Sequence, residues 1–270
     1  MMKNFVFDGL AYAKSVINNH DIDSKNANEH MLLLAKYNFH VHKMDDASNY
    51  RSIVDYMNKY WCLFVEADYQ MKIEDYVKNA HKYPFKDIES IKITRKELDF
   101  IANLNNIRLE KIAFVLLCIA KYECYYHETP KYWISWSLNN IAKLARVHVT
   151  KNENRQLFRD LVVAGVIESN SSNGSLFEHV LFVSDDKEDE VVLELSEIDY
   201  KELAYTYLFY KDGFSGYKHC EKCGILVKVK ANNQKYCKDC AQKVEQESIK
   251  NRVRKHRSQC NDSDPLVNNT

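Results

Sequence analysis

Four cysteines in this chain form two pairs whose spacing is suited to binding a metal. Cys220 and Cys223 form one CxxC pair, and Cys237 and Cys240 form a second pair thirteen residues further along. Each CxxC turn places two sulfurs on one side of a tight loop, so two turns can surround Zn²⁺ as a tetrahedron with Zn–S distances of ~2.3 Å. Four thiolates leave no open position for water or substrate, and the spacing therefore predicts one structural Zn²⁺ per chain.

Disulfide formation and redox chemistry are the alternative roles of paired cysteines. Disulfides belong to oxidising compartments, and the chain begins Met-Met-Lys-Asn-Phe, without the pattern of a secretory signal. A redox motif is typically a single CxxC beside a strand-helix unit, whereas two pairs occur here in a lysine-rich segment. We therefore expect a cytoplasmic protein with bound zinc, in which His219 is a neighbour of the site and not a ligand.

The other cysteines are not expected to bind metal. Three of them lie in apolar runs that predict helices, where a free cysteine usually behaves as a small buried hydrophobe; these are Cys62, Cys118 and Cys124.

The segment between the two cysteine pairs has the pattern of a hairpin. Residues 225–230 alternate apolar with basic side chains, Asn232 and Asn233 favour a turn, and residues 234–236 return. This predicts a hairpin with one CxxC turn at each end, which resembles a zinc ribbon. We expect the metal to hold this small lobe folded, because the lobe is too short for a core of its own.

The composition favours a mainly α fold with small β elements (α+β). Only 6 Gly and 3 Pro occur in 270 residues, so helices are favoured over a series of short strands. The longest apolar run, 112–120, is far shorter than a membrane span, which predicts a soluble protein without membrane contact. We expect a helical N-terminal region over 1–88, a second domain over 91–212, a zinc ribbon with a basic helix over 217–259, and a disordered tail over 260–270.

Apolar residues at three-four spacing predict the helices of the N-terminal region. These are 10–17, 30–39, 52–65 and 73–81. We find no chemistry in this region and expect it to be a scaffold or a contact surface for a protein partner.

The second domain contains two matches to the Ser/Thr-x-x-Glu capping box, Thr94 to Glu97 and Thr150 to Glu153. Between them we expect a long helix over 109–122, a short strand at 133–136 and a helix over 138–145. The second capping box opens a helix that ends near Ala164, and a hairpin with its tip at Asn173 follows. The order of these elements resembles a winged helix-turn-helix domain over about 94–195.

This resemblance implies that residues 151–164 form the recognition helix, which enters the major groove of DNA. Cationic and amide side chains are placed on its exposed side: Lys151, Asn152, Asn154, Arg155 and Arg159. Arg can bond guanine bidentately, Asn can bond adenine, and Lys suits phosphate. The hairpin tip has no Lys or Arg, however, and winged helices also serve as protein-binding modules.

Formal net charge is zero, but charge is unevenly distributed along the chain. Residues 185–202 contain nine acids and two lysines, whereas residues 218–257 contain twelve bases and four acids. We interpret the first segment, up to Glu190, as a solvated loop and not as a metal site. The second segment ends in a helix, 241–259, with few apolar side chains and with five cations: Lys250, Arg252, Arg254, Lys255 and Arg257. Such a helix suits backbone contact with a polyanion.

The whole chain resembles uncharacterised proteins of bacterial phages and mobile elements, chiefly over 98–117 and 220–241. Our leading hypothesis is a zinc-containing, non-catalytic protein that binds double-stranded DNA, either a transcriptional regulator or a replication-type factor. The alternative is an adaptor that binds proteins through the winged helix and tyrosine-rich surfaces. No phosphate loop, nucleophile elbow or metalloprotease motif supports an enzyme.

Overall fold

The computed structural model describes residues 5–128, 131–148, 150–172, 175–184, 186, 188–213 and 215–261, without the side chains of 151, 169–172, 175–177 and 255–261. The chain forms two compact units. The first comprises Met1–Ile91 and Cys124–Thr129, and the second comprises Lys92–Glu123 and Pro130–Thr270. The prediction of a mainly helical chain with small antiparallel sheets is confirmed.

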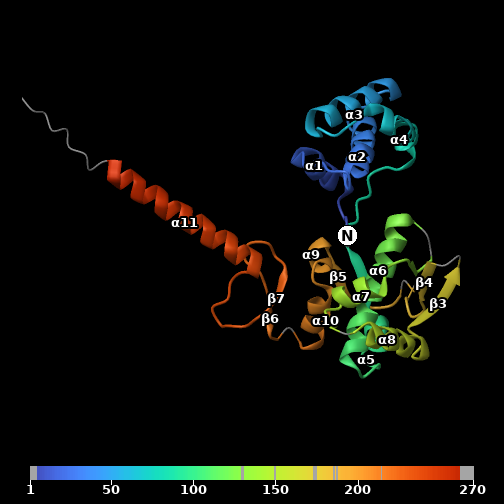
Figure 1. Ribbon diagram of the computed structural model, residues 1–270. Helices are drawn as coiled ribbons and strands as arrows, with labels where there is room; N and C mark the ends of the chain where they lie inside the picture. Colours follow the sequence, from blue (N-terminus) through green and yellow to red (C-terminus); the bar gives the residue numbers. More distant parts are fainter. Residues whose placement is uncertain are drawn as a thin grey trace, which may run out of the picture. The chain divides into compact units, whose positions relative to one another are not determined.

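Helix α2 is central to the first unit and packs against each of the other three helices (Figure 1). The helices are α1 (Gly9–Asn19), α2 (Ala27–His40), α3 (Asp46–Tyr60) and α4 (Glu66–Asn79), followed by the 3-10 turn η1 (Ala80–Lys82). Their shared core includes the fully buried Met31, Ile53, Met57 and Ile73. Most of the stability of these helices comes from this common apolar packing, as expected for short amphipathic helices.

The predicted helix over 52–65 is wrong at its end, because helix α3 stops at Tyr60. Trp61 adopts an extended backbone and turns its ring toward Phe64 and Tyr69. Apolar residues continue through the turn because both helices pack into the same core. Cys62 is therefore exposed in this turn, which corrects the expectation that it is buried in a helix.

The second unit is built on helix α6 (Ile107–His127) as far as Glu123, and residues 112–120 of this helix are all fully buried. Helix α5 (Arg95–Ala102) begins at the predicted capping box of Thr94 and Glu97. Strand β1 (Ile91–Thr94) pairs with β5 (Val191–Leu195). Buried Glu97 is paired with Lys121 of α6 at 2.7 Å and accepts a hydrogen bond from the Ser184 backbone N–H, so the charge is compensated on several sides.

Two short helices and a small sheet follow α6. Ser137 caps α7 (Leu138–Leu144), and Thr150 opens α8 (Lys151–Val163) through the second predicted capping box. The antiparallel sheet has the order β2-β4-β3, with β2 (Trp133–Ile134), β3 (Ile167–Ser172) and β4 (Ser175–Val180). The predicted hairpin is therefore present, while its tip, Asn173 and Gly174, lies outside the described residues.

The tyrosine-rich segment 200–210 is divided between α9 (Glu197–Tyr200) and α10 (Leu203–Lys211). Two of its tyrosines are core residues: Tyr200 donates to the Cys118 carbonyl and Tyr207 donates to the buried Glu110 carboxylate, both at 2.8 Å. Neither of these two tyrosines therefore contributes to the tyrosine-rich surfaces of the adaptor hypothesis. Strands β6 (Tyr217–His219) and β7 (Leu226–Lys228) and helix α11 (Lys238–Asn261) complete the described chain.

Candidate metal centre and nucleic-acid interface

The four predicted cysteine ligands gather at one point near the C-terminus. Cys220 and Cys223 lie in the connection between β6 and β7, whereas Cys237 directly precedes α11 and Cys240 lies in its first turn. The four Sγ atoms all lie within 4.8 Å of one another. In the described part of the chain, this is the single cluster of His, Cys, Asp or Glu side chains arranged to hold a metal ion.

The spacing of the sulfurs fits a tetrahedral zinc ion. Zn–S bonds of ~2.3 Å place the corners of a tetrahedron ~3.8 Å apart. The Sγ atoms of Cys223 and Cys237, which come from different CxxC turns, are 3.8 Å apart. The all-thiolate donor set and this distance both suit a structural Zn²⁺.

Backbone N–H groups donate hydrogen bonds to the cysteine sulfurs and so stabilise their thiolate form. The N–H of Cys237 donates to Cys220 Sγ at 3.3 Å, and the N–H of Cys240 donates to Cys237 Sγ at 3.4 Å. Burial raises the pKa of the Cys220 thiol, but backbone donation, led by Cys237, outweighs it and lowers this pKa to about 6. The neighbouring Cys223 sulfur raises the pKa of Cys240 to about 12. Four thiolates at this spacing therefore require a cation to offset their charge.

The hairpin differs from the predicted one. The paired strands are β6 and β7, which flank the first CxxC turn, with Tyr217 opposite Lys228 and His219 opposite Leu226. Residues 234–236 form no strand; instead the Gln234 side chain accepts from the Lys230 N–H at 2.9 Å. The second CxxC is thus carried by a loop and the first turn of α11, and the N–H groups of Cys237 and Cys240 donate to sulfur there.

His219 has a structural partner, which supports its expected role as a bystander. Its Nδ1 lies 2.8 Å from the carbonyl oxygen of Gly224, across the first CxxC turn. Gly224 itself has a φ of +74° and lies against Ile198 of α9, so that a Cβ at this position would be 3.3 Å from the Ile198 Cδ1. The CxxC spacing is the signal that pointed to this turn, whereas the contact with Ile198 has no sequence signal.

The zinc lobe docks on helices α9 and α10. Tyr205 and Phe209 of α10 make ring contacts with Tyr217 and His219 of β6, at centroid distances of 5.5 and 5.8 Å. The chain enters this docked lobe at Gly216, whose carbonyl accepts a hydrogen bond from the Val229 N–H at 2.9 Å.

Helix α8 presents part of the predicted DNA-contacting set to solvent. Asn152, Arg155 and Arg159 are exposed. Within the described residues, neither arginine takes part in an ion pair. The side chain of Lys151 lies outside the described part of the chain.

Asn154 does not belong to this exposed set. It is 3% exposed, and its Nδ2 donates to Asn139 Oδ1 on α7 at 3.1 Å. The prediction placed Asn154 near the exposed first turn, but the helix packs that side against α7 to bury Leu157 and Leu161. Asn154 is therefore a packing residue between two helices.

Helix α11 extends the cationic surface beyond the metal centre. None of the residues 241–254 is buried, and Val244 alone among them is half-buried. Near the cysteines, Lys222 forms an ion pair with Glu247 at 3.1 Å. Three of the predicted backbone-contacting residues are described as exposed, namely Lys250, Arg252 and Arg254, and the side chains of Lys255 and Arg257 lie outside the described part.

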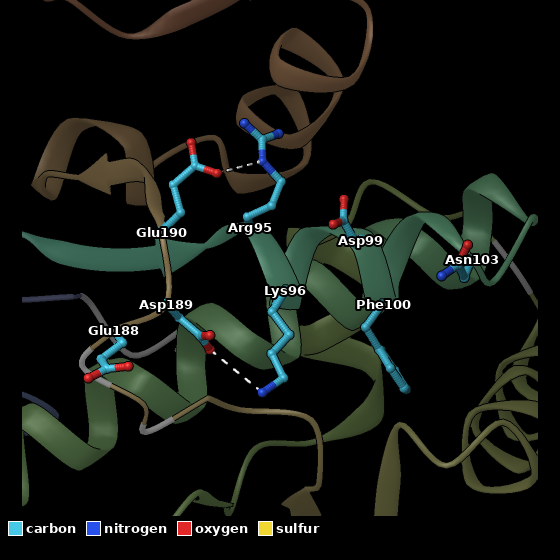
Figure 2. A pocket seen from close by; sticks show the side chains of 8 residues that line it. All are labelled: Arg95, Lys96, Asp99, Phe100, Asn103, Glu188, Asp189 and Glu190. Atoms are coloured by element: carbon cyan, nitrogen blue, oxygen red, sulfur yellow. Dashed lines mark hydrogen bonds and ion pairs between the residues drawn. The ribbon is translucent and has the colours of Figure 1, made fainter.

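The acidic segment before β5 folds back on helix α5 and lines a hollow of about 550 Å³ (Figure 2). Glu190 pairs with Arg95 at 3.3 Å, and Asp189 pairs with Lys96 at 3.9 Å. The prediction of a purely solvated loop is wrong for Asp189, whose side chain is 18% exposed.

In the described part of the chain, no helix combines the length and the apolar character that crossing a lipid bilayer requires. No protein-family model, no curated protein and no solved structure matches this chain. The relation to phage and mobile-element proteins therefore stays a prediction.

Proposed function

We propose that the chain is a zinc-containing, non-catalytic protein that binds double-stranded DNA, as a transcriptional regulator or a replication-type factor of a phage or mobile element. In this proposal α8 enters the major groove and α11 contacts the phosphate backbone. The observation that carries it is the exposure of Arg155 and Arg159 on α8, neither of which forms an ion pair within the described residues.

The order of elements around α8 supports a winged helix-turn-helix. Helix α7, a tight turn, helix α8 and the β3-β4 hairpin follow one another, and β2 adds a third strand to the hairpin. In such domains the second helix of the pair lies in the major groove. Exposed Asn152 and Arg155, in the N-terminal half of α8, are then placed to reach base edges, while Arg159 suits a phosphate.

Helix α11 supports the same proposal through electrostatics. Among the side chains described in α11, none beyond the first turn is buried, so packing contributes little and the cations are displayed to a partner at low cost in stability. Phosphates would neutralise these cations and release counterions. Because α8 and α11 belong to one chain, binding of α8 to DNA raises the effective concentration of α11 at the phosphate backbone.

Binding to a pool of random-sequence duplex DNA, measured by fluorescence polarisation at several salt concentrations, tests this proposal. We expect affinity to fall with salt, with a logarithmic slope of about 0.9 per phosphate contact. A chain that ends at Ser248 keeps all four cysteines but loses the cations from Lys250 onward, and should lower the slope by several contacts. Duplex binding that is absent in dilute buffer contradicts the proposal.

Sequence recognition is tested separately, by selecting bound sequences from the same pool. Arg155→Ala should weaken selected sites by about 1–3 kcal/mol and relax the preference at one base pair. Arg51→Ala is the matched control, because Arg51 is also an exposed arginine on a helix, α3 of the first unit. If Arg155→Ala and Arg51→Ala change DNA affinity equally, α8 is not part of the DNA interface. A Mg²⁺-dependent nuclease or primase assay on the same material tests the non-catalytic assignment.

A protein-binding adaptor is the second candidate, and exposed apolar side chains favour it. Val162 and Val163 at the end of α8 are 43% and 88% exposed, and Leu181 after β4 is 47% exposed. Apolar side chains near a hairpin suit a protein contact better than a phosphate backbone. An adaptor has no salt-dependent retention on duplex DNA, so the polarisation series separates the two candidates.

A further inference from the structure

We propose that Arg146 is a positioning residue that links the zinc lobe to helix α8, so that loading the metal fixes the turn from which α8 starts. Arg146 lies in the connection between α7 and α8 and contacts none of the metal ligands. Its consequence for DNA rests on the proposed function, whereas the structural link does not.

The backbone of Arg146 explains why the turn needs outside support. Its φ is +48°, in the left-handed region that costs a non-glycine residue about 1–2 kcal/mol. Such a conformation persists where surrounding contacts hold it. Three hydrogen bonds hold this backbone. The Arg146 carbonyl accepts from Lys111 Nζ of α6 at 3.1 Å, the Arg146 N–H donates to the Lys143 carbonyl at 3.0 Å, and the Val147 N–H donates to the Ala142 carbonyl at 2.9 Å.

The side chain of Arg146 ties the same turn to α10. Its guanidinium forms a two-point pair with Glu202, with the Nε–Oε2 bond at 2.8 Å. Glu202 is the N-cap residue of α10, and its side chain is 17% exposed. The guanidinium carbon also lies 4.4 Å from the ring centre of Tyr205, a cation–π contact. Paired, stacked geometry of this kind gives arginine a fixed orientation.

Tyr205 carries the link onward to the zinc lobe. Its ring centroid is 5.5 Å from that of Tyr217, the first residue of β6. Strand β6 leads directly into Cys220, and the Cys220 N–H donates to Ile225 across the same turn at 2.9 Å. The metal-dependent lobe therefore packs on the ring that holds Arg146. Unfolding of the lobe removes one side of the packing around this ring.

Hydrogen exchange, followed by mass spectrometry on the full chain, tests this link without DNA. Removing zinc with a chelator should accelerate exchange several-fold in the peptide over 142–150, as well as in the lobe itself. In Arg146→Met, which keeps the aliphatic stem but loses the charged pair, exchange in this peptide should be fast already. Chelation should then increase the exchange rate of this peptide only slightly further. A substitution that merely destabilises the protein should leave the increase on chelation in place.

Arg95→Met is the matched control, because Arg95 also pairs with a glutamate and also contacts a tyrosine of α10, Tyr210. It touches no residue of the α7–α8 turn and should leave the zinc response of the 142–150 peptide intact. The exchanged pair Arg146→Glu with Glu202→Arg should restore part of the response.

Two results overturn the proposal. One is a lobe that unfolds on chelation while exchange over 142–150 stays unchanged. The other is an Arg146→Met chain that responds to chelation as the unsubstituted chain does. Failure to bind duplex DNA, in contrast, refutes the proposed function but does not affect the structural link, which hydrogen exchange tests without DNA.

Discussion

At the scale of single residues, Gly224 shows how the first CxxC turn depends on one backbone conformation. Its φ is +74°, and its hydrogen faces Ile198 of α9. Gly216 has the same φ, but a Cβ there would meet nothing within 4 Å. An alanine at either position would pay the cost of a left-handed backbone, but only at Gly224 would its Cβ also crowd a neighbouring side chain.

We therefore expect Gly224→Ala to destabilise the lobe by more than the about 1–2 kcal/mol that the left-handed backbone costs any alanine. Gly216→Ala should show that backbone cost alone. Competition with a zinc chelator measures the metal affinity of both variants, and the difference between them reports the contact with Ile198. In the double variant Gly224→Ala with Ile198→Ala, the zinc affinity should be close to that of Gly216→Ala. Equal zinc affinities of the two single glycine variants would contradict the contact with Ile198.

We expect His30 to make the stability of the first unit sensitive to acid. It is 2% exposed on α2, and its Nδ1 lies 3.3 Å from the hydroxyl of Tyr56. Burial lowers the pKa of His30, and this outweighs the nearby acids Glu29 and Asp21, which raise it. Because the folded pKa is below the unfolded value of ~6.5, the unfolded chain binds the proton more readily. The stability contributed by neutral His30 is present above ~6.5 and is lost as pH falls through the folded pKa.

Urea unfolding at about pH 7 and about pH 5.5 tests this expectation. Fluorescence of Trp61 reports on the first unit when Trp133 and Trp136 are replaced by Phe. His30→Gln should reduce the loss of stability between the two pH values. His42→Gln, at an exposed histidine of the same unit, should leave the loss unchanged. An identical loss in both variants would mean that other groups cause the acid sensitivity.

At the scale of elements, α8 separates residues that position the helix from residues that it displays. Asn154 faces α7, and among described residues its Oδ1 has no hydrogen-bond partner, whereas its Nδ2 bonds to Asn139. Asn152 is exposed one half-turn earlier. Periodicity places a helix and its capping box well, but it does not decide how far around the helix the packed side extends.

Asn154→Ala should lower the free energy of unfolding by about 1 kcal/mol, because it removes the hydrogen bond to Asn139. Asn152→Ala should change it by no more than about 0.5 kcal/mol. For affinity to duplex DNA we expect the opposite ranking. Urea denaturation and fluorescence polarisation on the same two proteins measure both quantities, and a larger loss of DNA affinity in Asn154→Ala at equal stability would return Asn154 to the interface.

At the scale of the whole molecule, the metal should control the C-terminal lobe and not the first unit. We expect one zinc per chain by elemental analysis, and intense visible bands of a tetrahedral thiolate site after replacement with Co²⁺. Cys237→Ser or chelation should raise hydrogen exchange across 217–229 while the helices α2 and α3 stay protected. Cys62→Ser, at an exposed cysteine outside the cluster, is the control and should retain the zinc. Material that binds no zinc would refute the metal centre.

The sequence by itself determined the features that depend on neighbours along the chain. Both capping boxes, the hairpin after α8 and the four-cysteine set follow from local rules, since side chains three or four residues apart act on the same turn. The end of α3, the burial of Asn154 and the pairing of β6 with β7 were decided by tertiary structure. In each case the local sequence allows more than one conformation of nearly equal free energy, and packing against other elements decides which one forms. The contacts of Ile198 with Gly224 and of Glu202 and Tyr205 with Arg146 join residues far apart in sequence, and only the folded chain brings them together.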